Sequence, residues 1–225
     1  MFEKKIVFFI LIFFISLILP AGLAKPSAGK TAEKGVEGNA GEIHDDEESP
    51  DEEVMDLLYL PTPEYIVDKM LELAKVKKGD IVYDLGCGDG RIVVRAAKKY
   101  GAKGVGIDLN PERIEESLEN VKKHKVEKLV TIKKGNVLEE DLRKATVVTL
   151  YILPELMMRL EPILLDQLKP GSRVVSHAFT MDKWVPAKEE THVYEGAEYN
   201  LFLYVVPERE VKEQQKEQQK KQPKK

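Results

Sequence analysis

The sequence contains a single cysteine, Cys87, so no disulfide can form within the chain. It has no excess of positive charge, and its formal net charge of -4 disfavours a nonspecific nucleic-acid binder. It has no internal repeat and only one long apolar run. The remaining composition is ordinary for a soluble globular protein, and 225 residues leave room for one α/β domain with tails.

The long apolar run covers residues 6–19 and predicts a targeting segment. Lys4 and Lys5 precede it, and small residues such as Gly22 follow it, as at a signal-peptidase site. The core of the run is short for a membrane span, but a slightly extended run is compatible with an uncleaved anchor. We therefore expect residues 1–24 to be a signal peptide or a membrane anchor, and the protein to be exported or membrane-anchored.

Two polar segments flank the expected folded domain. Residues 25–53 are rich in Gly, Ala, Ser, Glu and Asp, and this composition cannot bury enough surface to offset the entropy of ordering. We expect a disordered acidic linker there. Residues 208–225 are rich in Lys and Gln, without apolar periodicity, and are expected to be a disordered tail. The folded domain is therefore expected at residues 54–207.

Strand-like and helix-like patterns alternate within this domain. Helices are expected at residues 62–74, 91–100, 110–123 and 154–168, and strands at residues 80–85, 104–108, 129–132, 145–151, 173–177, 192–194 and 201–206. Thr62 and Pro63 predict a helix start in which the Thr62 hydroxyl is the cap. Asn110 and Pro111 predict the start of the helix at residues 110–123, and Gly101 predicts a left-handed end for the helix at residues 91–100. The alternation predicts a parallel sheet with right-handed crossovers. The last two strands have no helix between them and are expected to form an antiparallel pair.

A glycine-rich turn follows the first expected strand, where residues 84–90 read Asp-Leu-Gly-Cys-Gly-Asp-Gly. Glycines at alternate positions let the backbone turn sharply and lie against a ligand. The helix that follows presents free amides at its N-terminus, which suit an anion. The turn alone is weakly specific, because other nucleotide-binding folds use similar turns.

Two features of this turn favour S-adenosylmethionine (SAM) over a dinucleotide. The glycines Gly86, Gly88 and Gly90 have the spacing G-x-G-x-G instead of G-x-G-x-x-G. Asp84 precedes them, and a carboxylate attracts the ammonium and sulfonium groups of SAM but repels a pyrophosphate. We therefore predict SAM as the cofactor.

Polar residues after the next two strands are candidate nucleoside ligands. Asp108 ends the second strand, where a carboxylate accepts ribose hydroxyls, although NAD enzymes use an acidic residue in the same way. Asn136 follows the third strand and is placed to bond the adenine amino group, with a turn asparagine as the rival interpretation. Cys87 is interpreted as a small residue in a tight turn. No metal site is predicted.

The region from about Tyr59 to Val206 resembles the class I SAM-dependent methyltransferases. Within that class it is similar to the small protein-lysine methyltransferases of archaea and their mitochondrial relatives, which act on ATP synthase c-subunit and adenine nucleotide translocase. The stretches that carry the resemblance are residues 59–63, 82–91, 145–151 and 169–177. The resemblance implies a Rossmann-like seven-stranded α/β sheet, mostly parallel with an antiparallel last strand and with helices on both faces.

The resemblance also implies roles on the cofactor side. Thr62 and its neighbours would close over the methionine end of SAM, although a helix cap explains Thr62 as well. Asp84, Gly86 and Gly88 would cradle the amino-acid part of SAM. Asp108 would bind its ribose.

On the acceptor side, Thr149 and Tyr151 lie at the carboxyl end of the expected fourth strand. The resemblance implies that both face the transferring methyl group, at the edge where open α/β sheets place their ligands. Core packing is the alternative for Tyr151. His177 and Trp184 are candidates for the acceptor channel, again with packing as the alternative.

The activity expected from the resemblance is methyl transfer to lysine side chains of a protein, with no nucleic-acid partner. The cofactor half of such a fold does not specify the acceptor, so a methyltransferase for a small molecule or RNA and a noncatalytic SAM-binding module stay open as alternatives. SAM is made in the cytosol, whereas the N-terminal run suggests export. A misassigned start, an anchor with the domain facing the cytoplasm, or an exported and idle protein would each resolve this conflict.

Overall fold

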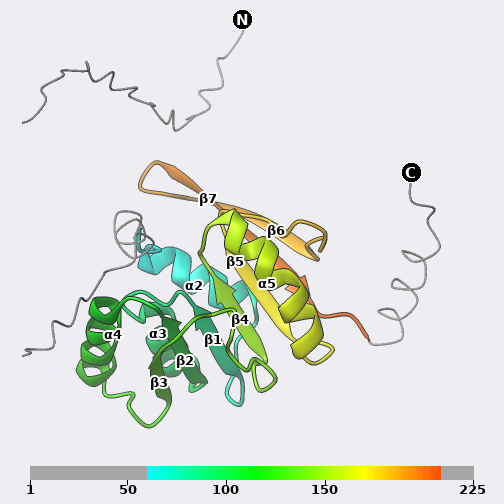
Figure 1. Ribbon diagram of the computed structural model, residues 1–225. Helices are drawn as coiled ribbons and strands as arrows, with labels where there is room; N and C mark the ends of the chain where they lie inside the picture. Colours follow the sequence, from blue (N-terminus) through cyan, green and yellow to red (C-terminus); the bar gives the residue numbers. More distant parts are fainter. Residues whose placement is uncertain (1–59, 209–225) are drawn as a thin grey trace, which may run out of the picture. The chain divides into compact units, whose positions relative to one another are not determined.

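The computed structural model describes residues 60–208 (Figure 1). The expected targeting segment, the acidic linker and nearly all of the expected tail lie outside the described residues. Among residues 60–208, no helix combines the length and the apolar character needed to cross a membrane.

Seven strands form one sheet with the order β3-β2-β1-β4-β5-β7-β6. The strands are β1 (Ile81–Leu85), β2 (Lys103–Asp108), β3 (Val130–Lys134), β4 (Val147–Leu150), β5 (Arg173–His177), β6 (Lys188–Tyr194) and β7 (Ala197–Val205). The first five strands pair in parallel, and β7 runs antiparallel to both of its neighbours. The expected seven-stranded, mostly parallel sheet is therefore confirmed.

The β6–β7 hairpin is longer than the sequence pattern predicted. Expected strands at residues 192–194 and 201–206 become strands of seven and nine residues. Polar residues such as Glu189 and Asn200 interrupt the apolar residues along both strands. The sequence pattern therefore indicates only the short apolar parts of each strand. Because His177 at the end of β5 pairs with Leu201, the first residues of β7 extend beyond the end of β5.

In the described part of the chain, four helices pack on the sheet: α2 (Glu64–Leu73), α3 (Arg91–Tyr100), α4 (Pro111–His124) and α5 (Pro154–Gln167). The Asn110 side chain caps α4 by accepting from the Glu112 and Arg113 amides, and Gly101 ends α3 in the left-handed conformation. Both were expected. The expected cap of α2 is wrong, because its N-cap residue is Pro63 and no side chain bonds the first turn.

The helices lie on both faces of the sheet, as expected (Figure 1). Helix α5 packs on one face through Met157, Leu160 and Leu164, while α2 and α3 cover the other face and α4 extends that layer. Strand β1 is central, with β2 on one side and β4 on the other. The chain reverses its winding direction there, and open α/β sheets bind ligands at such a switch point, where the parallel strands end. We call this edge the carboxyl edge and the opposite one the amino edge.

Candidate active site

The glycine loop between β1 and α3 brings bare backbone to the carboxyl edge. Gly86, Gly88 and Gly90 have φ values of 80°, 53° and 73°. At Gly86 an added Cβ would lie 2.9 Å from Cγ2 of Ile152, so glycine is required by both conformation and space. Gly86 is nevertheless exposed. The loop therefore offers its backbone to a ligand where a side chain would block the approach.

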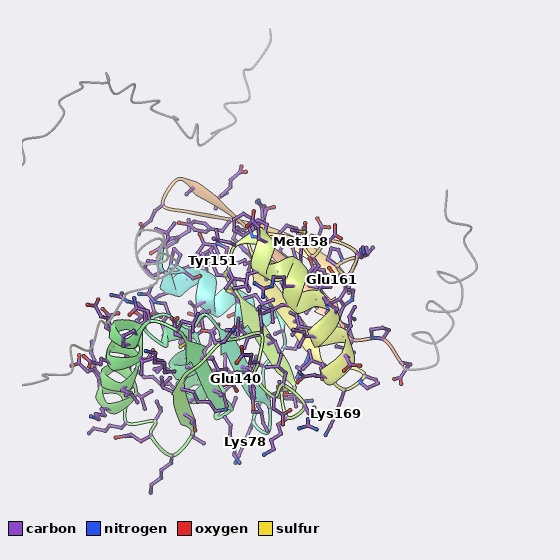
Figure 2. The ribbon with its side chains drawn as sticks, viewed as in Figure 1. Lys78, Glu140, Tyr151, Met158, Glu161 and Lys169 are labelled. Carbon is purple, nitrogen blue, oxygen red and sulfur yellow. The ribbon has the colours of Figure 1, made fainter. Side chains whose placement is uncertain are left out.

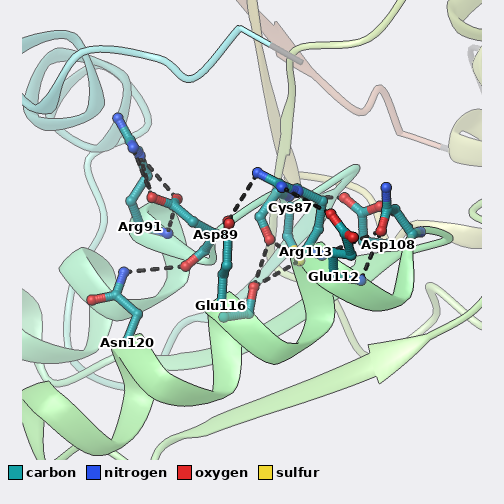
Figure 3. Close-up of polar contacts among 11 residues, drawn as sticks. Cys87, Asp89, Arg91, Asp108, Glu112, Arg113, Glu116 and Asn120 are labelled. Atoms are coloured by element: carbon teal, nitrogen blue, oxygen red, sulfur yellow. Dashed lines mark hydrogen bonds and ion pairs between the residues drawn. The ribbon is translucent and has the colours of Figure 1, made fainter. Parts of the chain in front are cut away.

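Asp108 ties the glycine loop to β2 (Figure 3). Its Oδ2 accepts from the Gly88 amide at 2.8 Å, and its Oδ1 accepts from the Asn110 amide at 3.0 Å. A carboxylate has more acceptor positions than these two donors use. Asp108 therefore fixes the loop and keeps acceptor capacity for the ribose hydroxyls that the sequence assigned to it.

Asp84 and Thr149 form a buried pair on adjacent strands. The Thr149 hydroxyl donates to Asp84 Oδ1 at 2.7 Å, and both residues are almost completely buried. No described lysine, arginine or histidine pairs with Asp84, and the charged groups that act on it are the carboxylates of Asp108 and Asp89. Burial, reinforced by these carboxylates, raises the pKa of Asp84 from 3.8 to about 7. The site thus holds a carboxyl group that a ligand ammonium would stabilise in its charged form.

Ser117 supports the glycine loop from α4, which the sequence did not indicate. Its hydroxyl donates to the Gly88 carbonyl at 2.6 Å and lies 3.8 Å from Cys87 Sγ. Burial raises the pKa of the Cys87 thiol, so Cys87 stays protonated and unreactive. Its Sγ would also lie 2.9 Å from a Cβ added at Gly106, which fits a small packing residue in a tight turn.

A second polar group, formed by Asp89, Arg91 and Asn120, lies beside the loop (Figure 3). Arg91 pairs with Asp89 through short hydrogen bonds, the closest at 2.7 Å, and the Asn120 side chain donates to the Asp89 carbonyl. The Arg91 Nη1 atom also donates to the Thr62 carbonyl at 2.9 Å. Arg91 therefore holds residues 60–63 next to the glycine loop.

The Thr62 hydroxyl lies 3.1 Å from Nδ1 of His177, a residue 115 positions away at the end of β5. The His177 ring packs against Tyr151, with centroids 4.0 Å apart, and against Tyr199 at 5.7 Å. Burial lowers the pKa of His177 from 6.5 to about 4, so the ring is neutral near pH 7. Residues from four separate segments thus meet at the carboxyl edge.

Two of the expected site residues already have partners within the protein. Asn136 accepts from the Leu138 amide at 3.0 Å and donates to Glu139 at 3.1 Å, which is the arrangement of a turn asparagine. That Asn136 binds the adenine amino group stays a prediction. It requires the Asn136 side chain to break one of these two hydrogen bonds. Trp184, which is half-buried in the loop that follows β5, packs against Tyr204 of the core with ring centroids 5.2 Å apart.

The residues at this edge fit SAM. Bare backbone at Gly86, an uncompensated carboxyl group at Asp84 and spare acceptor capacity at Asp108 match its amino-acid and ribose parts. Within residues 60–208 no three His, Cys, Asp or Glu side chains are grouped as a metal site would need. Two surface hollows, of about 480 and 460 Å³, are lined by other residues and lie away from this cluster.

Sequence comparison agrees with this assignment. A family model described as the ANTKMT methyltransferase domain matches residues 84–188. A protein-lysine N-methyltransferase of Saccharolobus islandicus is 49% identical over 152 residues, which cover 67% of this chain and 94% of that protein. An ATP synthase c-subunit lysine N-methyltransferase of Xenopus laevis is 31% identical over 130 residues, covering 58% of this chain and 57% of the relative.

Comparison with solved structures gives the same fold. An RNA methyltransferase from Salinibacter ruber, solved in complex with S-adenosyl-L-homocysteine (SAH), is 47% identical with a TM-score of 0.62. The match covers 66% of this chain and 95% of that one. Because a structure this similar holds the demethylated cofactor, SAM is the cofactor here as well. The chain therefore belongs to the class I SAM-dependent methyltransferases, in the family of the ANTKMT methyltransferase domain.

Proposed function

We propose that this protein transfers methyl groups from SAM to lysine side chains of a protein. The similar proteins from Saccharolobus islandicus and Xenopus laevis are both named for lysine methylation. SAM supplies a methyl group that its sulfonium charge already activates, so the protein mainly has to align donor and acceptor. The lysine nitrogen must arrive neutral and gives its proton to water, which requires no dedicated base.

The charge at the carboxyl edge supports a cationic acceptor. Glu155 at the start of α5 and Glu195 and Glu198 at the tip of the β6–β7 hairpin are exposed, and none pairs with a cation among residues 60–208. These carboxylates add negative charge to the acceptor side of the site. Negative charge attracts a lysine-bearing segment and repels phosphates.

A group of lysines without an ion-pair partner among the described residues lies at the opposite end of the domain. Lys77 and Lys78 precede β1, Lys144 precedes β4 and Lys169 precedes β5, so all four lie at the amino edge. Figure 2 shows Lys78 and Lys169 at the end of the domain opposite Tyr151. An RNA bound by these lysines would lie far from the methyl-transfer site. This distribution favours protein over RNA as the acceptor.

RNA is the second candidate, because the similar Salinibacter ruber structure is described as an RNA methyltransferase. The two functions are separated by incubating the purified full chain with methyl-tritiated SAM and a lysate of its own cells. Label that survives nuclease and appears as methyllysine after acid hydrolysis supports the proposal. Label that nuclease removes contradicts it. An Asp108→Ala variant, which lacks the expected ribose ligand, is the control for background labelling.

We also propose that residues 1–24 target or tether the protein to a membrane, on the basis of their apolar run. These residues lie outside the described part of the chain. Protease treatment of intact and of permeabilised cells tests the proposal, since an exported domain is cleaved in both and a cytoplasmic one only after permeabilisation. Recovery of the protein from the soluble cytosolic fraction with an intact N-terminus would contradict it.

A further inference from the structure

Thr62 forms hydrogen bonds to two separate segments at the carboxyl edge. Arg91 donates to its carbonyl at 2.9 Å, and its hydroxyl lies 3.1 Å from Nδ1 of His177. Thr62 itself is only 4% exposed. Both polar groups of one residue therefore bond to segments that are far away in the sequence.

The two residues that bond Thr62 lie on opposite sides of β4. Arg91 begins α3, directly after the glycine loop of β1, while His177 ends β5. Strand β4 lies between β1 and β5, and its end leads to Tyr151. Residues 60–63 consequently pass over the end of β4, between the glycine loop and the ring of His177.

The bond to His177 has no role in forming α2. The N-cap of α2 is Pro63, and no side chain bonds the first turn of the helix. The helix is held by its buried face, which includes Ile66, Met70 and Leu71. The Thr62 hydroxyl is thus used for a long-range contact and not for the helix that follows it.

The protein holds His177 firmly in the orientation that this contact needs. Its side chain is 3% exposed, and Nδ1 is the one ring nitrogen with a hydrogen-bond partner among the described residues. The next residue, Ala178, has a φ of 68°, which is unfavourable for alanine, and its amide bonds the Asn200 carbonyl at 2.8 Å. Backbone strain of this kind is retained where the surrounding structure sets a functional geometry.

We propose that His177 is a positioning residue which, through the Thr62 hydroxyl, holds residues 60–63 closed over the methionine end of the SAM site. The proposal concerns cofactor binding and does not depend on the identity of the acceptor. Loss of the hydrogen bond to His177 leaves the one from Arg91. Residues 60–63 would then be held only on the side of the glycine loop and would become more mobile on the side of His177.

Calorimetric titration of the full chain with SAH tests the proposal without any acceptor. Thr62→Val keeps the shape of the residue but removes the hydroxyl, and His177→Phe keeps a ring but removes the nitrogen. Each variant is expected to bind SAH about five- to tenfold more weakly, the effect of one lost hydrogen bond. The double variant should bind no more weakly than either single variant, because both remove the same contact.

Conservative variants and a matched control separate this role from a general loss of stability. Thr62→Ser and His177→Asn keep groups that can form the bond and should bind SAH within about twofold of the unchanged protein. Thr146→Val removes a threonine hydroxyl that bonds Asp80 at the amino edge, at 2.8 Å. It should lower the melting temperature without changing SAH affinity.

Three results would overturn the proposal. The first is unchanged SAH affinity in Thr62→Val, a mild substitution whose folding is checked by its unfolding transition. The second is an additive effect in the double variant. The third is equal weakening by Thr62→Val and Thr146→Val, which would mean that affinity only follows stability.

Discussion

Asp84 places a carboxyl group in the core of the site, with a hydroxyl donor but without a cation among the described residues. The unfolded chain would release this proton near pH 4, whereas the folded chain keeps it until about pH 7. The group therefore contributes stability that is complete at low pH and is lost as the pH rises through this window. His177 acts in the opposite sense, since its lowered pKa favours the folded state above about pH 6.5.

Cofactor binding should therefore release a proton from Asp84. The ammonium group of SAH stabilises the ionised carboxylate, so at about pH 6 most binding events must expel a proton. Titrations in two buffers with different ionisation enthalpies should report close to one proton released, and affinity should fall as the pH drops below about 7. Asp84→Asn should bind more weakly and release no proton. Affinity that is independent of pH between about 5.5 and 8 would show that Asp84 does not meet the ammonium.

Gly86 sets the second residue-scale prediction. Gly86→Ala introduces a Cβ at a φ of 80° and 2.9 Å from Ile152 Cγ2, so both the backbone and the neighbour are strained. We expect a loss of about 1–3 kcal/mol in the free energy of unfolding and at least tenfold weaker SAH binding. Gly79→Ala is the control, because it shares a positive φ of 96° but has nothing within 4 Å of the added Cβ. Equal SAH affinity in the two variants would contradict the role of Gly86 in binding the amino-acid part of SAM.

At the scale of elements, the loop after β5 is held by a buried acid on α5. The Glu161 carboxylate accepts from the Asp182 amide at 2.8 Å and from the Lys183 amide at 3.1 Å, and Tyr204 Oη accepts from the Met181 amide. The loop directly follows His177, so these bonds help to shape the acceptor side of the site.

Glu161→Gln should destabilise the protein by about 1–3 kcal/mol, because it replaces a charged acceptor of two amides with a neutral one and adds a buried donor. Chemical denaturation gives this free energy directly. The matched control is Glu155→Gln on the same helix, which is exposed and should change stability by less than about 0.5 kcal/mol. If Glu161→Gln leaves the free energy of unfolding unchanged, the loop is held by its apolar contacts alone.

Much of the element order was predictable because strand and helix periods are local properties. The glycine turn, the Asn110 cap and the Gly101 end of α3 were all read from a few adjacent residues. The β6–β7 hairpin was underestimated because its polar side chains break the apolar pattern that defines a half-buried strand. The cap assigned to Thr62 was wrong because α2 begins one residue later, with Pro63 at the N-cap, and the Thr62 hydroxyl contacts the distant His177.

At the scale of the whole domain, a group of exposed carboxylates and a group of exposed lysines lie at opposite edges of the sheet. Exposed carboxylates lie beyond the carboxyl edge, and exposed lysines surround a hollow of about 460 Å³ at the amino edge. Helix C-termini and their loops lie at the amino edge, where positive charge is favourable for the helix dipoles. The lysines near the helix C-termini therefore favour the fold, and the carboxylates at the other edge add negative charge to the acceptor side.

This separation predicts how charge reversal acts on turnover. Glu195→Lys with Glu198→Lys should lower kcat/KM on a lysine-rich peptide by about three- to tenfold at low salt, and the loss should shrink as salt is raised. Lys77→Glu with Lys144→Glu changes charge by the same amount at the other edge and should leave kcat/KM nearly unchanged. Similar effects from both pairs would remove the electrostatic argument for a protein acceptor.

The sequence by itself determined the class of fold, the turn that meets the cofactor and the sign of the charge beside it. These follow from residue periods and from neighbours such as Asp84 and Gly86, which need no knowledge of distant contacts. Only the tertiary structure decided that Thr149 bonds Asp84, that Thr62 bonds His177 and that β7 lies between β5 and β6. Those pairings join segments 65 and 115 residues apart, and which of them form depends on how the whole sheet packs.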